Sequence, residues 1–288
     1  MLARRAAQPE PPDLRIGTAA AAPPGDGHSP GLLVARHTVT TSTAEFRFVL
    51  VADERIGRRG LSEAIADAVA ELRAVDVTYS PLRPNSLVSL LRRGEVAPEI
   101  YPPLADIVDR CLAMRVATEG WFDPWAVPGG FDPAGMIKGW AVERAASRLR
   151  AAGISDYAVV SGGDLTVRGH APHGGPWRIA LFSPAAPGTA DRPPTVVTMV
   201  DGAIGTCGLT SRHSPVIDPH RGTVVRRESA ATVIGPDLAV ADGYATALFA
   251  AGPAGLHWFP TVDGYQMLTG GPTTARSAPV VSASDHGS

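Results

Sequence analysis

The sequence predicts an α+β domain, with helices mostly in the first half of the chain and strands mostly in the second. Glycine (31) and proline (27) make up about a fifth of the 288 residues, which argues against a coiled coil or an all-helical bundle. Apolar residues recur at helical spacing before residue 152, whereas short β-branched runs dominate after residue 156. Consecutive strand–helix–strand units are too few for a doubly wound parallel sheet.

Four helices are expected. In the first two, apolar side chains recur every three to four residues, so each helix presents one apolar face to a core. Pro102 and Pro103 suit the first turn of the second helix, and Gly153 and Gly252 suit the positions just after the last two. The expected helices are residues 61–76, a segment that includes 104–112, 138–151 and 238–251.

Short runs rich in β-branched residues predict the strands. The longest run, residues 37–51 (HTVTTSTAEFRFVLV), alternates in the manner typical of a strand. Asp263-Gly264 is a pair that joins hairpin strands, which predicts a hairpin within residues 262–268. The other expected strands are residues 157–160, 177–182, 195–200 and 230–234.

Charge and cysteine content exclude several classes of protein. The formal net charge is −2 and the basic residues form no stripe, so no nucleic-acid partner is expected. Cys111 and Cys207 lack the spacing of a zinc site or a disulfide scaffold. No apolar run approaches the roughly 20 residues of a membrane span, and the N-terminus has no signal-peptide pattern. We therefore expect a cytoplasmic protein.

Both ends of the chain differ in composition from its middle. Their proline, glycine and small polar residues cannot bury enough apolar surface to offset the loss of chain entropy on folding. The sequence therefore predicts one domain at residues 31–271, between disordered tails at residues 1–30 and 272–288.

A first candidate site lies in the segment FDPAGMIKGWAVERA, where Asp132, Gly135 and Lys138 follow one another at a spacing of three. Gly135 lets a ligand approach the backbone and leaves its carbonyl available to a cation. Lys138 in the first turn of a helix opposes the helix dipole, which makes sense if an anion is held there. The alternative is a surface turn, with Asp132 as helix cap and Lys138 in solvent.

A second candidate lies on the last helix, where Asp242 and Thr246 are four residues apart and share one face. Two oxygen ligands one turn apart suit a hard cation such as Mg²⁺, which takes further oxygens from water and phosphates. The alternative is local: Thr246 bonds the carbonyl of Asp242, and the acid caps the helix or faces water.

Two further segments have both a functional and a structural interpretation. Ser161-Gly162-Gly163-Asp164 follows a strand, where it either exposes backbone to a ligand or simply forms a turn. Trp121-Phe122-Asp123 follows a helix, where the aromatic rings either stack on a flavin or adenine or belong to the core.

The order of these segments is more specific than any one of them. TYSPLRPNSLVSLL, GWFDP, DPAGMIKGWAVERA, YAVVSGGDLTVRG, DGAIGTCG, VIDPHRG and ADGYATALFAAG follow one another along the chain. This series resembles the ApbE family of FAD:protein FMN transferases, and it covers roughly residues 38–270. The resemblance implies a single T-fold-like domain, in which helices flank a mixed, mainly antiparallel sheet.

The resemblance also implies an activity and a set of site residues. Such enzymes transfer FMN from FAD, through its phosphate, to a Thr or Ser hydroxyl of a client protein, with Mg²⁺ and with release of AMP. By motif, Asp242, Thr246 and the backbone carbonyl of Gly135 are the implied metal ligands. The residues implied in contact with FAD are Trp121, Phe122, Asp123, Asp132, Lys138 and Val216.

The chain departs from the family pattern in three places. The family's usual histidine, three residues before Asp218, is Pro215 here. His213 is the nearest histidine and the candidate catalytic base, provided that its loop shifts. Relatives have some tens of residues where this chain has only residues 125–131. Leu82 replaces an aromatic residue that stacks on the flavin.

Two other functions remain open at this stage. In a Mg²⁺-dependent FAD pyrophosphatase, water would replace the client hydroxyl, and AMP and FMN would form without a client. In a flavin-binding module with weak or no transfer, loss of the family histidine would leave bound FAD intact. Loss of an acid–base group typically costs about 10²–10⁴-fold in rate.

Overall fold

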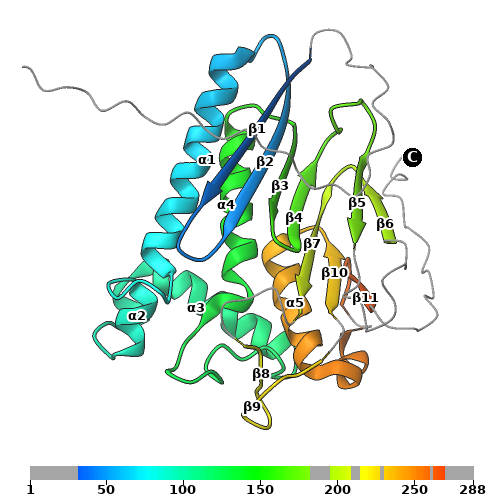
Figure 1. Ribbon diagram of the computed structural model, residues 1–288. Helices are drawn as coiled ribbons and strands as arrows, with labels where there is room; N and C mark the ends of the chain where they lie inside the picture. Colours follow the sequence, from blue (N-terminus) through cyan, green and yellow to red (C-terminus); the bar gives the residue numbers. More distant parts are fainter. Residues whose placement is uncertain (1–31, 182–194, 209–214, 228–229, 260–261, 270–288) are drawn as a thin grey trace, which may run out of the picture.

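One antiparallel sheet of seven strands forms the centre of the computed structural model, which describes residues 32–181, 195–208, 215–227, 230–259 and 262–269 (Figure 1). The strand order is β1-β2-β3-β4-β7-β10-β11, and every neighbouring pair runs antiparallel. The strands are β1 (Leu32–Thr40), β2 (Glu45–Asp53), β3 (Asp156–Ser161), β4 (Asp164–Arg168), β7 (Gly202–Cys207), β10 (Ala231–Gly235) and β11 (Gln266–Thr269).

Helices cover one face of this sheet, and a small second sheet lies on the other (Figure 1). The helices are α1 (Gly57–Tyr79), α2 (Leu87–Arg92), α3 (Pro102–Ala117), α4 (Ile137–Ala151) and α5 (Leu238–Ala251). The 3₁₀ helices are η1 (Pro98–Ile100), η2 (Pro133–Gly135) and η3 (Gly252–Leu256). The two-stranded sheets are β5 (Trp177–Leu181) with β6 (Thr195–Met199), and β8 (Ile217–Asp218) with β9 (Thr223–Val224).

Alternation along β2 divides the apolar side chains between two cores. Successive side chains of a strand point to opposite faces, so Phe48 and Leu50 join the main core beneath the helices. Val49, between them, joins a smaller core with Trp177 of β5 and Ile204 of β7. The sheet is therefore buried on both faces along its middle strands.

The four predicted helices are confirmed, and α5 has the predicted bounds. Gly153 follows the end of α4 and has a φ of +80°. The amide of the next residue, Ile154, donates to the carbonyl of Leu149 at 3.0 Å. Among the described helices, none combines the length and the apolar composition needed to cross a bilayer. The predicted α+β class with a mainly antiparallel sheet is also confirmed.

The prediction of a single strand over residues 37–51 was wrong, because β1 and β2 form a hairpin with a turn at residues 41–44. The turn contains no glycine or proline. Instead, the Thr41 amide donates to the Ala44 carbonyl at 2.8 Å, and the Thr41 hydroxyl accepts from the amide of Thr43 at 3.3 Å. Hydroxyl side chains that bond nearby backbone can build such turns, although β-branched residues favour strands.

The hairpin predicted within residues 262–268 was also wrong. Gly264 does adopt a turn conformation, with φ of +77°, but β11 pairs with β10 instead of with a strand just before the turn. By contrast, Gly162-Gly163 forms a two-residue turn between β3 and β4, in which Ser161 pairs with Asp164. β4 and β7 were not predicted, and they contribute two of the central strands.

Candidate active site

Helix α5 contacts α4 and the residues just before α4 through hydrogen bonds spaced one helical turn apart. As the contacts advance along α5, they move back along the segment that contains α4. The amide of Leu238 donates to Glu143 Oε1 at 3.1 Å. One turn further along α5, Asp242 Oδ2 accepts from the Gly139 amide at 3.3 Å. One further turn along α5, the Thr246 hydroxyl donates at 3.1 Å to the carbonyl of Gly135, the last residue of η2. The two helices therefore cross antiparallel, in one register.

Two glycines permit the close approach of backbone to α5 around Asp242. A Cβ atom on Gly139 would lie 2.5 Å from the carbonyl oxygen of Leu238. A Cβ atom on Gly205, in β7, would lie 2.5 Å from the amide nitrogen of Asp242. Only glycine fits at such contacts with backbone. The carboxylate of Asp242 is consequently enclosed, and the residue has no exposed surface.

The Thr246 hydroxyl and the Gly135 carbonyl meet directly, whereas the buried carboxylate of Asp242 contacts the Gly139 amide one turn away and belongs to the lining of neither described pocket. The Thr246 hydroxyl also donates to the Asp242 carbonyl at 2.9 Å, so the local interaction considered as the alternative for this pair is present as well. A Cβ atom on Gly135 would lie 2.7 Å from the Phe122 ring and 3.1 Å from Thr246 Oγ1. Three neutral or anionic oxygens of this kind are the donors that Mg²⁺ prefers, and the residues present fit such a cation.

Most of the predicted site residues line one pocket, which we call the α5 pocket. Gly135 and Thr246 lie in its wall, next to the segment that follows α3 and the segment that leads into β8. Its lining is Trp121, Phe122, Asp123, Pro124, Val127, Asp132, Ala134, Gly135, Pro215, Val216, Ile217 and Thr246. The fold therefore gathers residues that lie more than 120 positions apart in the sequence.

A second pocket, the α1 pocket, lies beside the first and shares Ala134 with it. It is an open hollow between the end of α1, the turn between β1 and β2, and the start of α4. Its lining is largely apolar: Thr43, Ala44, Phe46, Leu72, Val75, Asp76, Tyr79, Ser80, Pro81, Leu82, Ala134, Ile137, Lys138 and Ala141. Leu82 at its rim is 56% exposed.

Lys138 reaches the α1 pocket while its ammonium group is held by the sheet. Its Nζ lies 2.5 Å from Asp164 Oδ2, and the Asp164 side chain has no exposed surface. The other oxygen of Asp164 accepts from the amide of Thr206 in β7 at 2.7 Å. The aspartate that ends the Gly-Gly turn thus fixes the position of the lysine, and sequence reasoning had not paired these two residues.

Asp132 uses both carboxylate oxygens within the protein. Oδ1 accepts from the amide of Ala134 at 3.0 Å and so caps η2, as the alternative interpretation of this segment expected. Oδ2 lies 3.0 Å from Nη2 of Arg92, at the end of α2. The carboxylate lines the α5 pocket, and its partners hold it against the loop that precedes Gly135.

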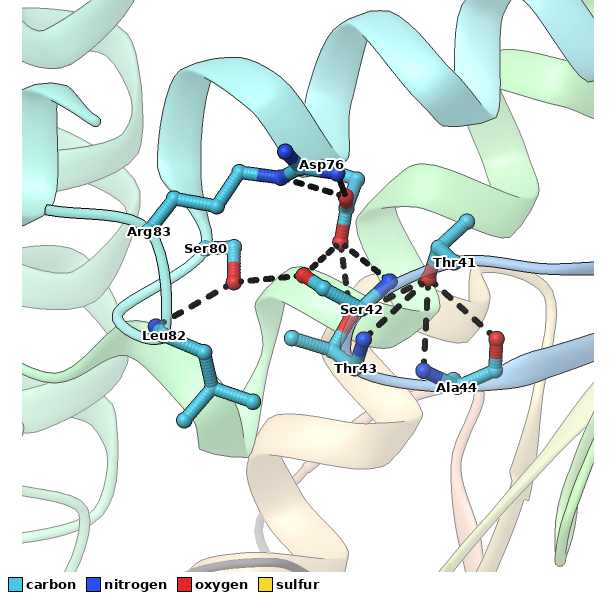
Figure 2. Close-up of polar contacts among 8 residues, drawn as sticks. All are labelled: Thr41, Ser42, Thr43, Ala44, Asp76, Ser80, Leu82 and Arg83. Atoms are coloured by element: carbon cyan, nitrogen blue, oxygen red, sulfur yellow. Dashed lines mark hydrogen bonds and ion pairs between the residues drawn. The ribbon is translucent and has the colours of Figure 1, made fainter. Parts of the chain in front are cut away.

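A buried carboxylate at the end of α1, Asp76, was missed from the sequence (Figure 2). Its Oδ1 accepts from the amide of Ser42 at 3.1 Å and from the Ser42 hydroxyl at 2.6 Å. Its Oδ2 accepts from Arg83, with Nε at 2.7 Å and Nη2 at 2.6 Å. Ser80 completes the network, because its hydroxyl lies 3.0 Å from that of Ser42 and accepts from the Leu82 amide.

This network joins three segments that line the α1 pocket: the turn between β1 and β2, the last turn of α1, and residues 80–83. Its signal in the sequence was a carboxylate within the apolar face of a helix, between Leu72 and Tyr79. Tyr79 also contributes to the wall. Burial raises the pKa of Tyr79 to about 12, so its hydroxyl stays protonated and donates to the Pro103 carbonyl at 2.8 Å.

The candidate catalytic base, His213, lies outside the described residues. Pro215, which occupies the position of the family histidine, lines the α5 pocket. The His220 ring lies edge-on to Trp121, with ring centroids 4.3 Å apart. Trp121 is thereby held at the pocket wall by a residue of the β8–β9 hairpin.

Comparisons with known proteins identify the family. The model of the ApbE family matches residues 128–268. A protein of Vibrio cholerae named FAD:protein FMN transferase is 30% identical over 219 residues, which are 70% of this chain and 60% of that protein. A protein of Klebsiella pneumoniae with the same name is 35% identical over 245 residues, which are 75% of this chain and 67% of that protein.

The chain belongs to the ApbE family. It spans 60% of the length of its Vibrio cholerae relative. The fold of this ApbE-family protein agrees with solved structures. The flavin transferase ApbE from Vibrio cholerae superposes with a TM-score of 0.66 at 20% identity, over 83% of this chain and 97% of that one. The ApbE protein from Thermotoga maritima gives the same TM-score and identity, over 82% and 94%.

Proposed function

We propose that this ApbE-family protein transfers FMN from FAD to a Thr or Ser hydroxyl of a client protein and releases AMP, with Mg²⁺ bound. The observation that carries the proposal is the contact between the Gly135 carbonyl and the Thr246 hydroxyl in the wall of the α5 pocket, one helical turn from the buried carboxylate of Asp242. Curated relatives named FAD:protein FMN transferase support the same reaction.

Gly135, Asp242 and Thr246 are the proposed magnesium ligands. When bound, Mg²⁺ would neutralise charge on the diphosphate of FAD and hold it in line for attack. The register of α4 and α5 sets the spacing of these ligands before any metal arrives. Such preorganisation limits the cost of ordering the ligands when the cation binds.

The two pockets suit the two ends of FAD. The α1 pocket is largely apolar, which suits a flat tricyclic ring, and it contains Leu82, the counterpart of an aromatic residue that stacks on the flavin in the family. The α5 pocket offers Trp121 and Phe122 to the nucleotide end. Ala134 belongs to both pockets, so the diphosphate would pass beside Gly135 and Lys138 at their junction.

The proposed chemistry is a displacement at phosphorus. The client hydroxyl oxygen forms a bond to the phosphorus of FMN while the bond from that phosphorus to the bridging oxygen breaks. AMP departs with the electron pair of the broken bond, and the hydroxyl proton passes to a base, for which His213 remains the predicted residue. Lys138 would counter the negative charge of the diphosphate during this step.

A specific observation also favours a second candidate function, a flavin-binding protein with weak or no transfer. Pro215 lines the α5 pocket in place of the family histidine, and its side chain cannot accept or donate a proton. This candidate predicts that bound FAD stays intact, whereas the transferase predicts consumption of FAD only when a client is present.

The two functions are distinguished by incubation with FAD, MgCl₂ and a protein that a FAD:protein FMN transferase relative modifies. The transferase predicts a fluorescent adduct that survives denaturation, carries the added mass of FMN in a mass spectrum, and forms with one AMP per adduct. Asp242→Asn, which removes one metal ligand's charge, should abolish the adduct. Intact FAD after hours would favour the binding protein, and AMP release without a client would indicate a pyrophosphatase.

A further inference from the structure

The guanidinium of Arg92 ties the end of helix α2 to the segment that carries Gly135. Its Nε donates to the Phe131 carbonyl at 2.7 Å, and its Nη2 lies 3.0 Å from Asp132 Oδ2. The Arg92 side chain is 22% exposed and that of Asp132 only 6%. A planar guanidinium that engages two acceptors fixes orientation as well as distance, which an ammonium group cannot do.

This restraint reaches the proposed metal site in two further contacts. Asp132, held by Arg92, caps η2 through the amide of Ala134. The 3₁₀ helix η2 ends at Gly135, whose carbonyl accepts from the Thr246 hydroxyl at 3.1 Å. Arg92 is absent from the lining of both pockets, so we expect it to act on the site through Phe131, Asp132 and η2.

The loop before η2 needs an external anchor. Gly129 and Gly130 both have positive φ, +89° and +90°, and a Cβ atom on either would meet nothing within 4 Å. Glycine in open surroundings leaves the backbone free to move. The anchors of this loop include the Asp132 amide, which donates to the Pro124 carbonyl at 2.8 Å, and the two contacts of Arg92.

We propose that Arg92 is a positioning residue for the magnesium site: it holds Phe131 and Asp132 so that the Gly135 carbonyl faces Thr246. The inference rests on the proposed function, in which this carbonyl is a metal ligand. Partners that orient metal ligands typically account for about 10–100-fold in metal affinity. Loss of Arg92 should therefore weaken metal binding by about that factor and leave the rest of the fold in place.

Metal binding without FAD or client provides the direct test. Mn²⁺ is titrated into the full-length wild type, Arg92→Ala and Arg92→Lys, and the free ion is counted by its electron paramagnetic resonance signal. Arg93→Ala is the matched control, because Arg93 bonds Glu95 and the Pro84 carbonyl and does not contact the Gly135 loop. Unfolding temperatures are measured without metal in parallel.

We expect the Mn²⁺ dissociation constant to rise about 10–100-fold in Arg92→Ala and less in Arg92→Lys, and to remain unchanged in Arg93→Ala. In turnover assays, excess Mg²⁺ should restore the rate of Arg92→Ala. Wild-type affinity in a folded Arg92→Ala variant would overturn the positioning role alone. A wild type that binds no Mn²⁺ would overturn the metal site itself, and this role with it. If Arg92→Ala fails to fold, wild-type affinity in Arg92→Lys overturns the role.

Discussion

Replacing Gly139 by alanine tests the helix crossing on which the candidate site depends. The added Cβ would lie 2.5 Å from the Leu238 oxygen, 2.9 Å from its carbonyl carbon and 3.0 Å from the Cα of Ala239. These are backbone atoms, so no side-chain rotation relieves the contact. Ordinary van der Waals contact begins near 3.4 Å, so α4 and α5 must separate by roughly 0.9 Å. Overpacking of this kind typically lowers the free energy of unfolding by about 1–3 kcal/mol.

The matched control is Gly60→Ala in α1. There the added Cβ would meet only the side chain of Ile56, at 2.9 Å, and that side chain can move. Alanine in a helix interior is favoured over glycine by up to about 1 kcal/mol, so this variant should be as stable as the wild type or more stable. Urea unfolding gives both free energies, and Mn²⁺ titration reports the site.

Gly139→Ala should lose about 1–3 kcal/mol and should also bind Mn²⁺ more weakly, because Asp242 and Gly135 are held in register by this crossing. Wild-type stability together with wild-type Mn²⁺ affinity would show that Gly139 does not determine how α4 and α5 cross. Lower stability with unchanged affinity would show that the crossing supports the fold but does not set the ligand spacing.

Three other substitutions address the charged groups around the site. Asp164→Asn removes the carboxylate that Lys138 contacts at 2.5 Å. Because removal of one partner of a buried ion pair costs about 3–5 kcal/mol, urea unfolding should show a loss of stability near the lower figure. No loss would contradict the pairing. Burial raises the pKa of Glu143 above 4.5, so the folded protein holds the carboxyl proton more tightly than the unfolded chain does. The stability of the wild type should therefore fall as the pH rises from 4.5 through the folded-state pKa. Glu143→Gln should reduce this fall, and parallel curves of stability against pH for the two proteins would contradict the prediction. Asp76→Asn places an amide nitrogen or a neutral oxygen opposite Arg83 and leaves a polar group poorly paired. Urea unfolding should show a loss of about 1–3 kcal/mol, and wild-type stability would contradict the role given to this network.

Local signals in the sequence were sufficient for four of the described α-helices, but the short helix α2 was not predicted. The apolar spacing of α1, the proline pair that begins α3 and the glycines that follow α4 and α5 act within a few residues, and the structure agrees with each. The hairpin turn at residues 41–44 was missed because threonine favours strands by type, whereas here the Thr41 hydroxyl bonds nearby backbone. Residue type alone does not distinguish these two outcomes.

The kind of domain, the order of its blocks and the residue types available for a metal and a dinucleotide can all be read from the sequence. Which of these residues meet depends on the fold. Gly135 and Thr246 are 111 residues apart, and Gly139 and Asp242 are 103 apart. Arg92, Asp164 and Asp76 likewise act on partners brought to them by the fold. Helix and turn signals arise between residues that are near neighbours in the sequence, whereas a site depends on how helices cross. The close crossing of α4 and α5 is possible because Gly139 has no side chain.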